Sequence, residues 1–268
     1  MWHDVVDLNA FYGGRLGQVA RRMIRRRLRA LWPDVRGLSL LGLGYATPYL
    51  GVFRAEAART LAVMPASQGV MAWPRDESRL VALADEAELP FADGTIDRVL
   101  LVHAIECSEQ LRPMLREVWR VLDPGGRLLV VAPNRRGIWA RLERTPFGHG
   151  HPFSPPQLSR LLRESMFSPL RSAAALFVPP HGSRVFLRSA GAWERVGARC
   201  WAPFAGVVLT EAAKQVYAVN PERLGRRLQR PRFPLPVGGS ALMGPRLDRC
   251  KAEKSPRGRP GWLAPPGP

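Results

Sequence analysis

The residues best suited to acid–base chemistry follow an apolar run in the middle of the chain. The segment "IDRVLLVHAIE" ends with His103 and Glu106 close together. A neutral imidazole can accept a proton from a reacting group, and a carboxylate is a second candidate base. Both residues also have structural interpretations, His103 as a hydrogen-bonded histidine and Glu106 as the partner of an arginine.

Other polar residues follow the next apolar run, "RLLVVAP". Asn134 comes directly after it and either orients a substrate or caps the turn. His149 and His151 stand two residues apart in the glycine-rich segment "GHGH". A metal site built on these histidines would require two more ligands, and the surrounding sequence offers none. The sequence therefore predicts no metal site.

A glycine-spaced turn lies earlier in the chain, in "LSLLGLGYATPYLG". Gly42 and Gly44 let the backbone pass close to a ligand at the end of a strand. The helix that follows offers its amino end to an anionic or polar group. A dinucleotide fingerprint would have Gly or Ala where Thr47 stands, and an acid in place of the later "VMPASQ". These departures argue against NAD.

Strand and helix patterns alternate around these residues. Strands are predicted at 37–44, 61–66, within 78–91, and at 96–105, 127–134, 173–179 and 206–219. Helices are predicted at 51–61, 110–122 and 155–166, the last capped by Ser154. Such alternation is typical of an α/β fold with a parallel, doubly wound sheet.

Residues 15–32 predict a further helix, with apolar residues on one face and arginines on most of the other. A basic amphipathic helix can lie on a membrane surface or resemble a transit peptide. It can equally cover a sheet. The short loop that leads directly into the strand at 37–44 favours the covering helix.

Composition limits the remaining choices. The chain has 268 residues, 46% of them apolar, without an 18-residue apolar run, so no membrane span is predicted. The first residues do not resemble a secretory signal. Three scattered cysteines argue against a disulfide framework and fit a reducing compartment, so a cytoplasmic location is expected.

The net charge of +18 is uneven along the chain. Residues 221–268 hold eleven Lys or Arg against three Asp or Glu, and ten prolines. This tail is expected to be disordered. Two interpretations of the charge compete: attraction to nucleic acid or an anionic surface, and arginine that serves simply as a solvated cation; the second is favoured.

Four segments together resemble one known family. They are "GLGYA", "ADEAELPFADGTIDRVLLVHAIE", "LREVWRVLDPGGRLLVVAPN" and "HPFSPPQLSRLL", spread over roughly half the chain. In this order and spacing they resemble bacterial class I S-adenosylmethionine-dependent methyltransferases, of the branch that acts on small molecules. The resemblance implies a Rossmann-like seven-stranded sheet with an antiparallel last hairpin.

The resemblance also implies S-adenosyl-L-methionine as the cofactor. Its contacts would fall on the glycine turn, on the residues after the third strand and on the end of the fourth, namely Gly42, Leu43, Gly44, Tyr45, Ala46, Asp85, Glu86, Val102 and His103. A carboxylate at Asp85 would accept a hydrogen bond from the adenine amino group. Val102 and His103 would border the methionine part and the reacting methyl group.

Two acids that the family usually carries are missing. Leu40 stands two residues before the first glycine, and Met64 with Pro65 stands where an acid would grip the ribose hydroxyls. Losing one charge-assisted hydrogen bond costs about 1.5–3 kcal/mol, or roughly ten- to a hundredfold in affinity. Ser67 or Gln68 could bond the ribose instead.

The loop at 135–153 is expected to act as a lid over the substrate. Its arginines would suit an anionic substrate, and equally a solvated loop; they are Arg135, Arg136, Arg141 and Arg144. Trp139 and Phe147 either stack on a substrate ring or pack on the core.

The favoured hypothesis is a single methyltransferase-like domain at 1–220 that methylates a small or medium-sized acceptor, with His103 or Glu106 as the base. Two alternatives remain. One is a protein of the same fold that binds the cofactor weakly and uses its basic surface on a partner, and the other is an RNA methyltransferase. Fold does not decide among them.

Overall fold

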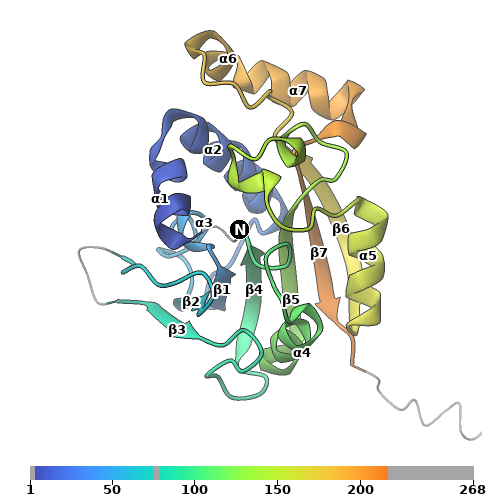
Figure 1. Cartoon of the computed structure of the whole chain (residues 1–268). Coiled ribbons are helices and arrows are strands. Elements are labelled where there is room, and N and C mark those ends of the chain that lie inside the picture. Colours follow the sequence, from blue (N-terminus) through green and yellow to red (C-terminus); the bar gives the residue numbers. More distant parts are fainter. Residues whose placement is uncertain (1–3, 75–78, 217–268) are drawn as a thin grey trace, which may run out of the picture. The chain divides into compact units, whose positions relative to one another are not determined.

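The computed structural model describes residues 4–74 and 79–216, which belong to one compact unit (Figure 1). A seven-stranded sheet has the order β3-β2-β1-β4-β5-β7-β6. The first five strands are parallel, and β7 runs antiparallel to both neighbours. The strands are β1 (Ser39–Gly44), β2 (Arg59–Pro65), β3 (Val81–Ala84), β4 (Ile96–Val102), β5 (Leu122–Pro133), β6 (Phe167–Ala175) and β7 (Val207–Lys214). The predicted fold class is confirmed, including the last hairpin.

Helices cover both faces of the sheet. They are α1 (Val5–Gly13), α2 (Arg15–Leu31), α3 (Thr47–Leu50), α4 (Leu111–Val121), α5 (Pro155–Glu164), α6 (Arg184–Arg188) and α7 (Ala190–Cys200), with short 3₁₀ turns at Trp139–Arg141, Pro146–Gly148 and Ala202–Phe204. Leu100 and Val102 of β4 pack with α1, α2 and α3. Val99 and Leu101 face α4 and α5. Side chains alternate between the faces of a strand, so one apolar run supplies both cores.

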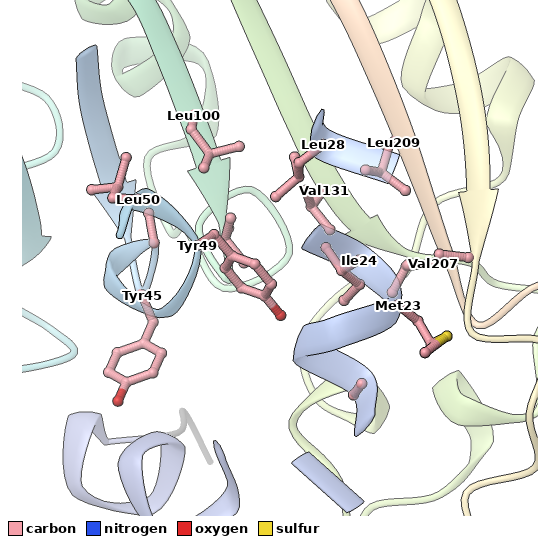
Figure 2. Packing of buried hydrophobic residues seen from close by; sticks show 14 of the residues in the cluster. Met23, Ile24, Leu28, Tyr45, Tyr49, Leu50, Leu100, Val131, Val207 and Leu209 are labelled. Atoms are coloured by element: carbon pink, nitrogen blue, oxygen red, sulfur yellow. The ribbon is translucent and has the colours of Figure 1, made fainter. Parts of the chain in front are cut away.

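Helix α2 confirms the prediction of a covering helix. Its buried residues Met23, Ile24 and Leu28 face Val131 of β5 and Leu209 of β7 (Figure 2). The arginines lie on the other side, at the surface or partly buried. Packing against the sheet therefore takes up the apolar face that a membrane helix would offer to lipid. None of the helices in the described part of the chain is long and apolar enough to cross a membrane.

Two local predictions were wrong, and one helix was not predicted. The segment 51–61, expected as a helix, forms turns that lead into β2, and the short helix α3 precedes it. The Pro48 carbonyl, which a longer α3 would bond to residue 52, accepts from Arg25 Nε at 2.8 Å. The strand expected at 173–179 lies earlier, as β6. Helix α7 occupies a segment for which no structure was predicted.

The cap expected before 155–166 is present. Ser154 begins α5 with a capping box, in which its side chain accepts from the Gln157 backbone while Gln157 bonds back to Ser154. Residues 217–268 lie outside the described part of the chain, and with them the expectation of a disordered tail.

Candidate functional site

The segments predicted to hold a cofactor meet at one edge of the sheet. Parallel strands end on the same side, and the register pairs Gly44 of β1 with Val102 of β4 and Pro65 of β2 with Ala84 of β3. The predicted residues therefore gather at the carboxyl ends of four neighbouring strands. They are Gly42, Leu43, Gly44, Tyr45, Ala46, Met64, Pro65, Asp85, Glu86, Val102 and His103.

Both glycines of the turn are required by protein packing. Gly44 has φ +80°, and a Cβ there would lie 2.4 Å from the Val102 carbonyl oxygen. A Cβ at Gly42 would lie 2.6 Å from a methyl group of Leu50. The glycines thus let β1 approach β4 and let α3 fold back on β1, which is a structural reason for them beside any role in binding.

A cavity of about 130 Å³ lies beyond the ends of β2 and β3. The exposed Asp85 lines it, and one of its carboxylate oxygens accepts from the Ala87 amide at 2.8 Å. Glu86 is buried, and its carboxylate accepts from the Ser108 hydroxyl, so its side chain serves the loop packing. The cavity is lined by Pro65, Ala66, Ser67, Asp85, Glu86, Glu109 and Gln110.

Glu109 and Gln110 line this cavity but were not predicted from the sequence. They follow Glu106 by three and four positions, in the loop that leaves the carboxyl end of β4. That placement was the available signal, because loops at this end of parallel strands meet at one edge.

A buried chain of polar side chains lies at the end of β4. The Tyr49 hydroxyl donates to the Tyr12 hydroxyl at 2.9 Å, and Tyr12 lies 2.7 Å from His103 Nε2. On the other side of the ring, His103 Nδ1 lies 3.2 Å from a carboxylate oxygen of Glu106. Exposure is 4% for Tyr12, 2% for His103 and 1% for Glu106. The chain thus runs from tyrosine through imidazole to carboxylate, almost without water.

The two tyrosines of this chain are neutral hydroxyl groups. Burial raises the pKa of Tyr12 well above its ordinary value, and the neighbouring Tyr49 raises it further. Burial likewise raises the pKa of Tyr49. A neutral Tyr12 that accepts from Tyr49 has its own proton to give, and His103 Nε2 is the acceptor within reach. His103 Nδ1 then carries the proton that is donated to Glu106.

The backbone at His103 is unusual. His103 has φ +50°, a left-handed conformation that is uncommon for a residue with a side chain. Its carbonyl oxygen accepts a hydrogen bond from the Gln68 side chain. Residues held in such conformations cluster at functional sites, and here the turn directs the ring toward Tyr12 and Glu106.

Tyr12 is the main functional candidate that the sequence did not reveal. It comes from α1, which docks on the loop after β2 through a bond from the Val5 amide to the Gln68 carbonyl at 2.9 Å. Its ring stacks on Tyr45 of the glycine turn, with ring centres 5.7 Å apart. No local pattern connects Tyr12 with His103, 91 positions later, so only the fold brings them together.

Comparison with known proteins shows which sequences and folds this chain resembles. Residues 41–130 match the sequence family described as "Methyltransferase domain". A demethylmenaquinone methyltransferase of Corynebacterium efficiens is 32% identical over 130 residues, which are 48% of this chain and 56% of that protein. A malonyl-[acyl-carrier protein] O-methyltransferase of Pectobacterium atrosepticum is 28% identical over 108 residues, 40% of this chain and 43% of that one. The chain thus spans about half the length of these relatives.

Solved structures agree on the fold. A methyltransferase from Thermotoga maritima, described as a possible histamine N-methyltransferase, has a TM-score of 0.58 at 17% identity and covers 79% of this chain and 96% of that one. A putative methyltransferase of Haloferax volcanii, solved with its Trm112 activator, also has a TM-score of 0.58 at 17% identity, covering 80% and 99%. Residues 41–130 therefore resemble a methyltransferase domain, and the fold is that of class I S-adenosylmethionine-dependent methyltransferases.

The two ends of the site fit the methyltransferase cofactor differently. At the adenine end, the cavity beside Asp85 offers a carboxylate acceptor, as the resemblance implies. At the methionine end, Tyr12 lies directly against His103, which was assigned to that part of the cofactor, and against Tyr45 of the glycine turn. The adenine end therefore fits as it stands, whereas the methionine end is covered by α1.

The position where the family has an acid for the ribose is buried in this structure. Met64 is 1% exposed and belongs to the same apolar cluster as Val5 and Leu8 of α1. Its sulfur accepts from the Met71 amide at 3.4 Å. Of the two substitutes considered for the ribose contact, Gln68 is engaged with the His103 carbonyl, while Ser67 lines the cavity. Only Ser67 is placed for that contact.

The loop at 135–153, which is expected to act as a lid, is fastened to the core in this structure. Trp139 is 1% exposed and its indole N–H donates to the Val178 carbonyl at 2.8 Å, so it presents no ring to a substrate. Phe147 is buried between Trp139 and His103, with its ring centre 5.0 Å from that of His103. Both aromatic residues pack on the core, which was the structural alternative.

The remaining predicted residues have structural partners. The Asn134 amide donates to the carbonyls of Pro203 and Ala205 at 2.9 and 2.8 Å, which ties the end of β5 to the segment before β7. The His149 ring bonds the Glu143 carbonyl. The His151 amide donates to the Glu106 carbonyl at 2.8 Å. Across residues 4–74 and 79–216, no group of three or more His, Cys, Asp or Glu side chains is arranged to hold a metal ion.

Proposed function

We propose that this protein transfers a methyl group from S-adenosyl-L-methionine to a small-molecule acceptor. The observation that supports this most directly is the juxtaposition of two features at one sheet edge. The cavity beside Asp85 offers an acceptor for an adenine amino group, and three strands away the buried His103–Glu106 pair offers a base. Methyl transfer requires binding, alignment and, for a protonated nucleophile, a proton acceptor.

In this proposal the cofactor binds with its adenine in the cavity. Asp85 accepts from the exocyclic amine, Ser67 contacts the ribose, and the backbone from Gly42 to Ala46 borders the methionine part. Helix α1 must shift, since Tyr12 lies over Tyr45. When bound, the cofactor supplies the electrophilic methyl group, so the chain itself has only to orient the acceptor and take a proton.

His103 is the base of the proposed reaction. Glu106 holds the Nδ1 proton, which leaves the Nε2 lone pair directed at Tyr12. The shift of α1 moves Tyr12 aside, so the acceptor gives its proton directly to Nε2. The imidazolium that forms is stabilised by the Glu106 carboxylate.

Calorimetric titration with S-adenosylmethionine and S-adenosylhomocysteine tests the proposal. We expect micromolar binding that Asp85→Ala weakens by roughly ten- to a hundredfold, since a charge-assisted hydrogen bond is lost. Asp34→Ala is the matched control, because Asp34 pairs with Arg36 in the loop before β1, at the opposite edge of the sheet. Absence of binding up to millimolar cofactor would refute the proposal.

A second candidate is a binding protein of this fold without methyl transfer. The observation that favours it is the covered methionine end, where α1 packs over Met64 and Tyr12 over Tyr45. Its partner would be an anionic molecule such as RNA, attracted by the net charge of +18. This candidate predicts no cofactor binding, together with RNA affinity that falls steeply with salt.

We place the reaction in the cytoplasm. Support comes from the cysteines of the described residues, since Cys107 is buried, Cys200 is exposed, and both are free thiols. Burial raises the pKa of the Cys107 thiol, which keeps it in the unreactive protonated form.

A further inference from the structure

A second cavity lies on the other side of Tyr12. It measures about 280 Å³ and is bordered by α1, α2 and α3, with Trp73 from the loop after β2. Tyr12, Tyr45 and Thr47 form the wall nearest the glycine turn. The opposite wall carries Arg21 and Arg25 of α2. The volume is close to the lower limit for small-molecule sites, and the lining combines aromatic rings with positive charge.

Arg25 is held firmly without a carboxylate partner. It is half-buried, and its guanidinium donates to the Pro48 carbonyl, at 2.8 Å from Nε. Burial lowers the pKa of Arg25, and the charge of Arg21 lowers it further. No Asp or Glu of the described residues forms a salt bridge with Arg21 or Arg25. An anion between the two guanidinium groups would relieve this repulsion.

The positive charge continues beyond the cavity. A neighbouring groove of about 580 Å³ shares Arg21 and Arg25 and follows α2. Five arginines and a single acid, Glu56, line it, and Glu56 is already bonded to Arg29. A solvated helix face would show the same residue types, but here the arginines line a concave surface that opens into the cavity beside Tyr12.

The arginines of the loop at 135–153 are less well placed than those of α2 to bind an anionic acceptor. Arg144 of the loop at 135–153 donates to the Pro180 carbonyl at 2.9 Å, in support of local structure. None of the four loop arginines lines the cavity beside Tyr12. The groups that an anion would meet next to the proton-accepting chain are therefore those of α2.

We propose that the cavity between α1, α2 and α3 binds the methyl acceptor, and that the acceptor is a small molecule with a phosphate or carboxylate group held by Arg21 and Arg25. Its reacting atom is directed toward His103, which the shift of α1 uncovers. This inference rests on the proposed function, because the bound molecule is a methyl acceptor only if the protein transfers a methyl group. The anion site itself can be tested without any methyl transfer.

Calorimetry of the full chain with pyrophosphate and with citrate at low salt tests the site. We expect binding of at least one of them, and the stronger of the two indicates whether the acceptor carries phosphate or carboxylate. Arg21→Gln should weaken the binding of this anion by about tenfold or more. Arg21 is the cleaner position, because Arg25 also supports the Pro48 turn. Arg25→Gln provides the second test, read together with its thermal stability.

Arg160→Gln is the matched control. It makes the same change of charge on α5, at a side chain that is 82% exposed and paired with Glu164. The control should leave anion binding unchanged, and all three variants should keep the affinity for S-adenosylhomocysteine.

Three results would overturn the inference. The first is equal loss of anion binding in Arg160→Gln, which indicates unspecific attraction. The second is loss of S-adenosylhomocysteine affinity in Arg21→Gln, which would assign the arginines to the cofactor. The third is an RNA oligonucleotide that binds more tightly than pyrophosphate through the same arginines. Cofactor binding without anion binding would refute this site alone, whereas anion binding without cofactor binding would refute the methyltransferase proposal alone.

Discussion

The two ends of the strand edge differ sharply in their access to water. Beside β3, Asp85 is exposed and lines a cavity. Beside β4, His103 and Glu106 are buried beneath Tyr12 of α1. Recognition at the first end needs only groups that already face solvent, whereas chemistry at the second needs α1 to move. Substitutions should therefore affect stability at the covered end and ligand affinity at the open end.

The largest effect is expected from Met64→Glu, which introduces the missing acid beneath α1. Because Met64 is 1% exposed among apolar residues, a carboxylate there has no partner and should lower the free energy of unfolding by about 3–5 kcal/mol. Urea denaturation measures the change, with Met64→Leu as a control that keeps the site apolar. A stable Met64→Glu protein that binds the cofactor more tightly would show that this end is open.

Tyr12→Phe should have the next largest effect. It leaves Tyr49 without its acceptor and His103 Nε2 without its donor, at a cost of about 1–3 kcal/mol in the free energy of unfolding. Affinity for S-adenosylhomocysteine should not fall, because the variant holds α1 less firmly and α1 must move for the cofactor to bind. Tyr49→Phe serves as the control, since Tyr12 then keeps its bond to His103 and the cost should be smaller. Cofactor binding lost in Tyr12→Phe would place this hydroxyl in the binding site.

Asp85→Ala reverses that pattern. Asp85 is exposed, so its loss should change the free energy of unfolding by no more than about 0.5 kcal/mol. The same change should weaken S-adenosylhomocysteine by roughly ten- to a hundredfold. Denaturation and calorimetry on one preparation give both numbers. A variant that is destabilised but binds normally would contradict the division between the two ends.

The smallest effect concerns alkaline pH. The pKa of Tyr12 and of Tyr49 is raised in the folded protein above the ordinary value of about 10. The folded state thus retains protons that the unfolded state releases, so the contribution of these two tyrosines to stability is constant below about pH 10 and falls as pH rises further. Denaturation at several alkaline pH values should show this loss, and Tyr12→Phe should show less of it. Equal losses in both proteins would mean that Tyr12 is not shielded.

The sequence predicted well whatever depends on local pattern. Apolar runs of strand length located β1, β4 and β5, and the glycines of "GLGYA" marked the end of β1 correctly. Because parallel strands share a carboxyl edge, these assignments also brought Gly44, Asp85 and His103 to one place. Contacts between segments distant in sequence were not predictable. The docking of α1, which covers Met64 and pairs Tyr12 with His103, depends on such contacts.

The errors have the same cause. Helix α3 does not continue into the segment 51–61, where a helix was expected, and Arg25 from α2 occupies the Pro48 carbonyl that a longer α3 would use. Trp139 in a basic loop has the composition of a substrate contact, yet the Val178 carbonyl and the ring of Phe147 draw it into the core. In both places a tertiary contact outweighs a local preference, and no pattern within the segment signals that contact.

Hydrogen exchange of the full chain, with and without S-adenosylhomocysteine, tests the difference between the two ends most directly. Cofactor binding with the adenine beside Asp85 should slow amide exchange in residues 83–87. Displacement of Tyr12 should at the same time speed exchange in α1, residues 5–13. Slower exchange at 83–87 with α1 unchanged would contradict the requirement that α1 moves. No change in either segment at millimolar ligand would contradict cofactor binding itself.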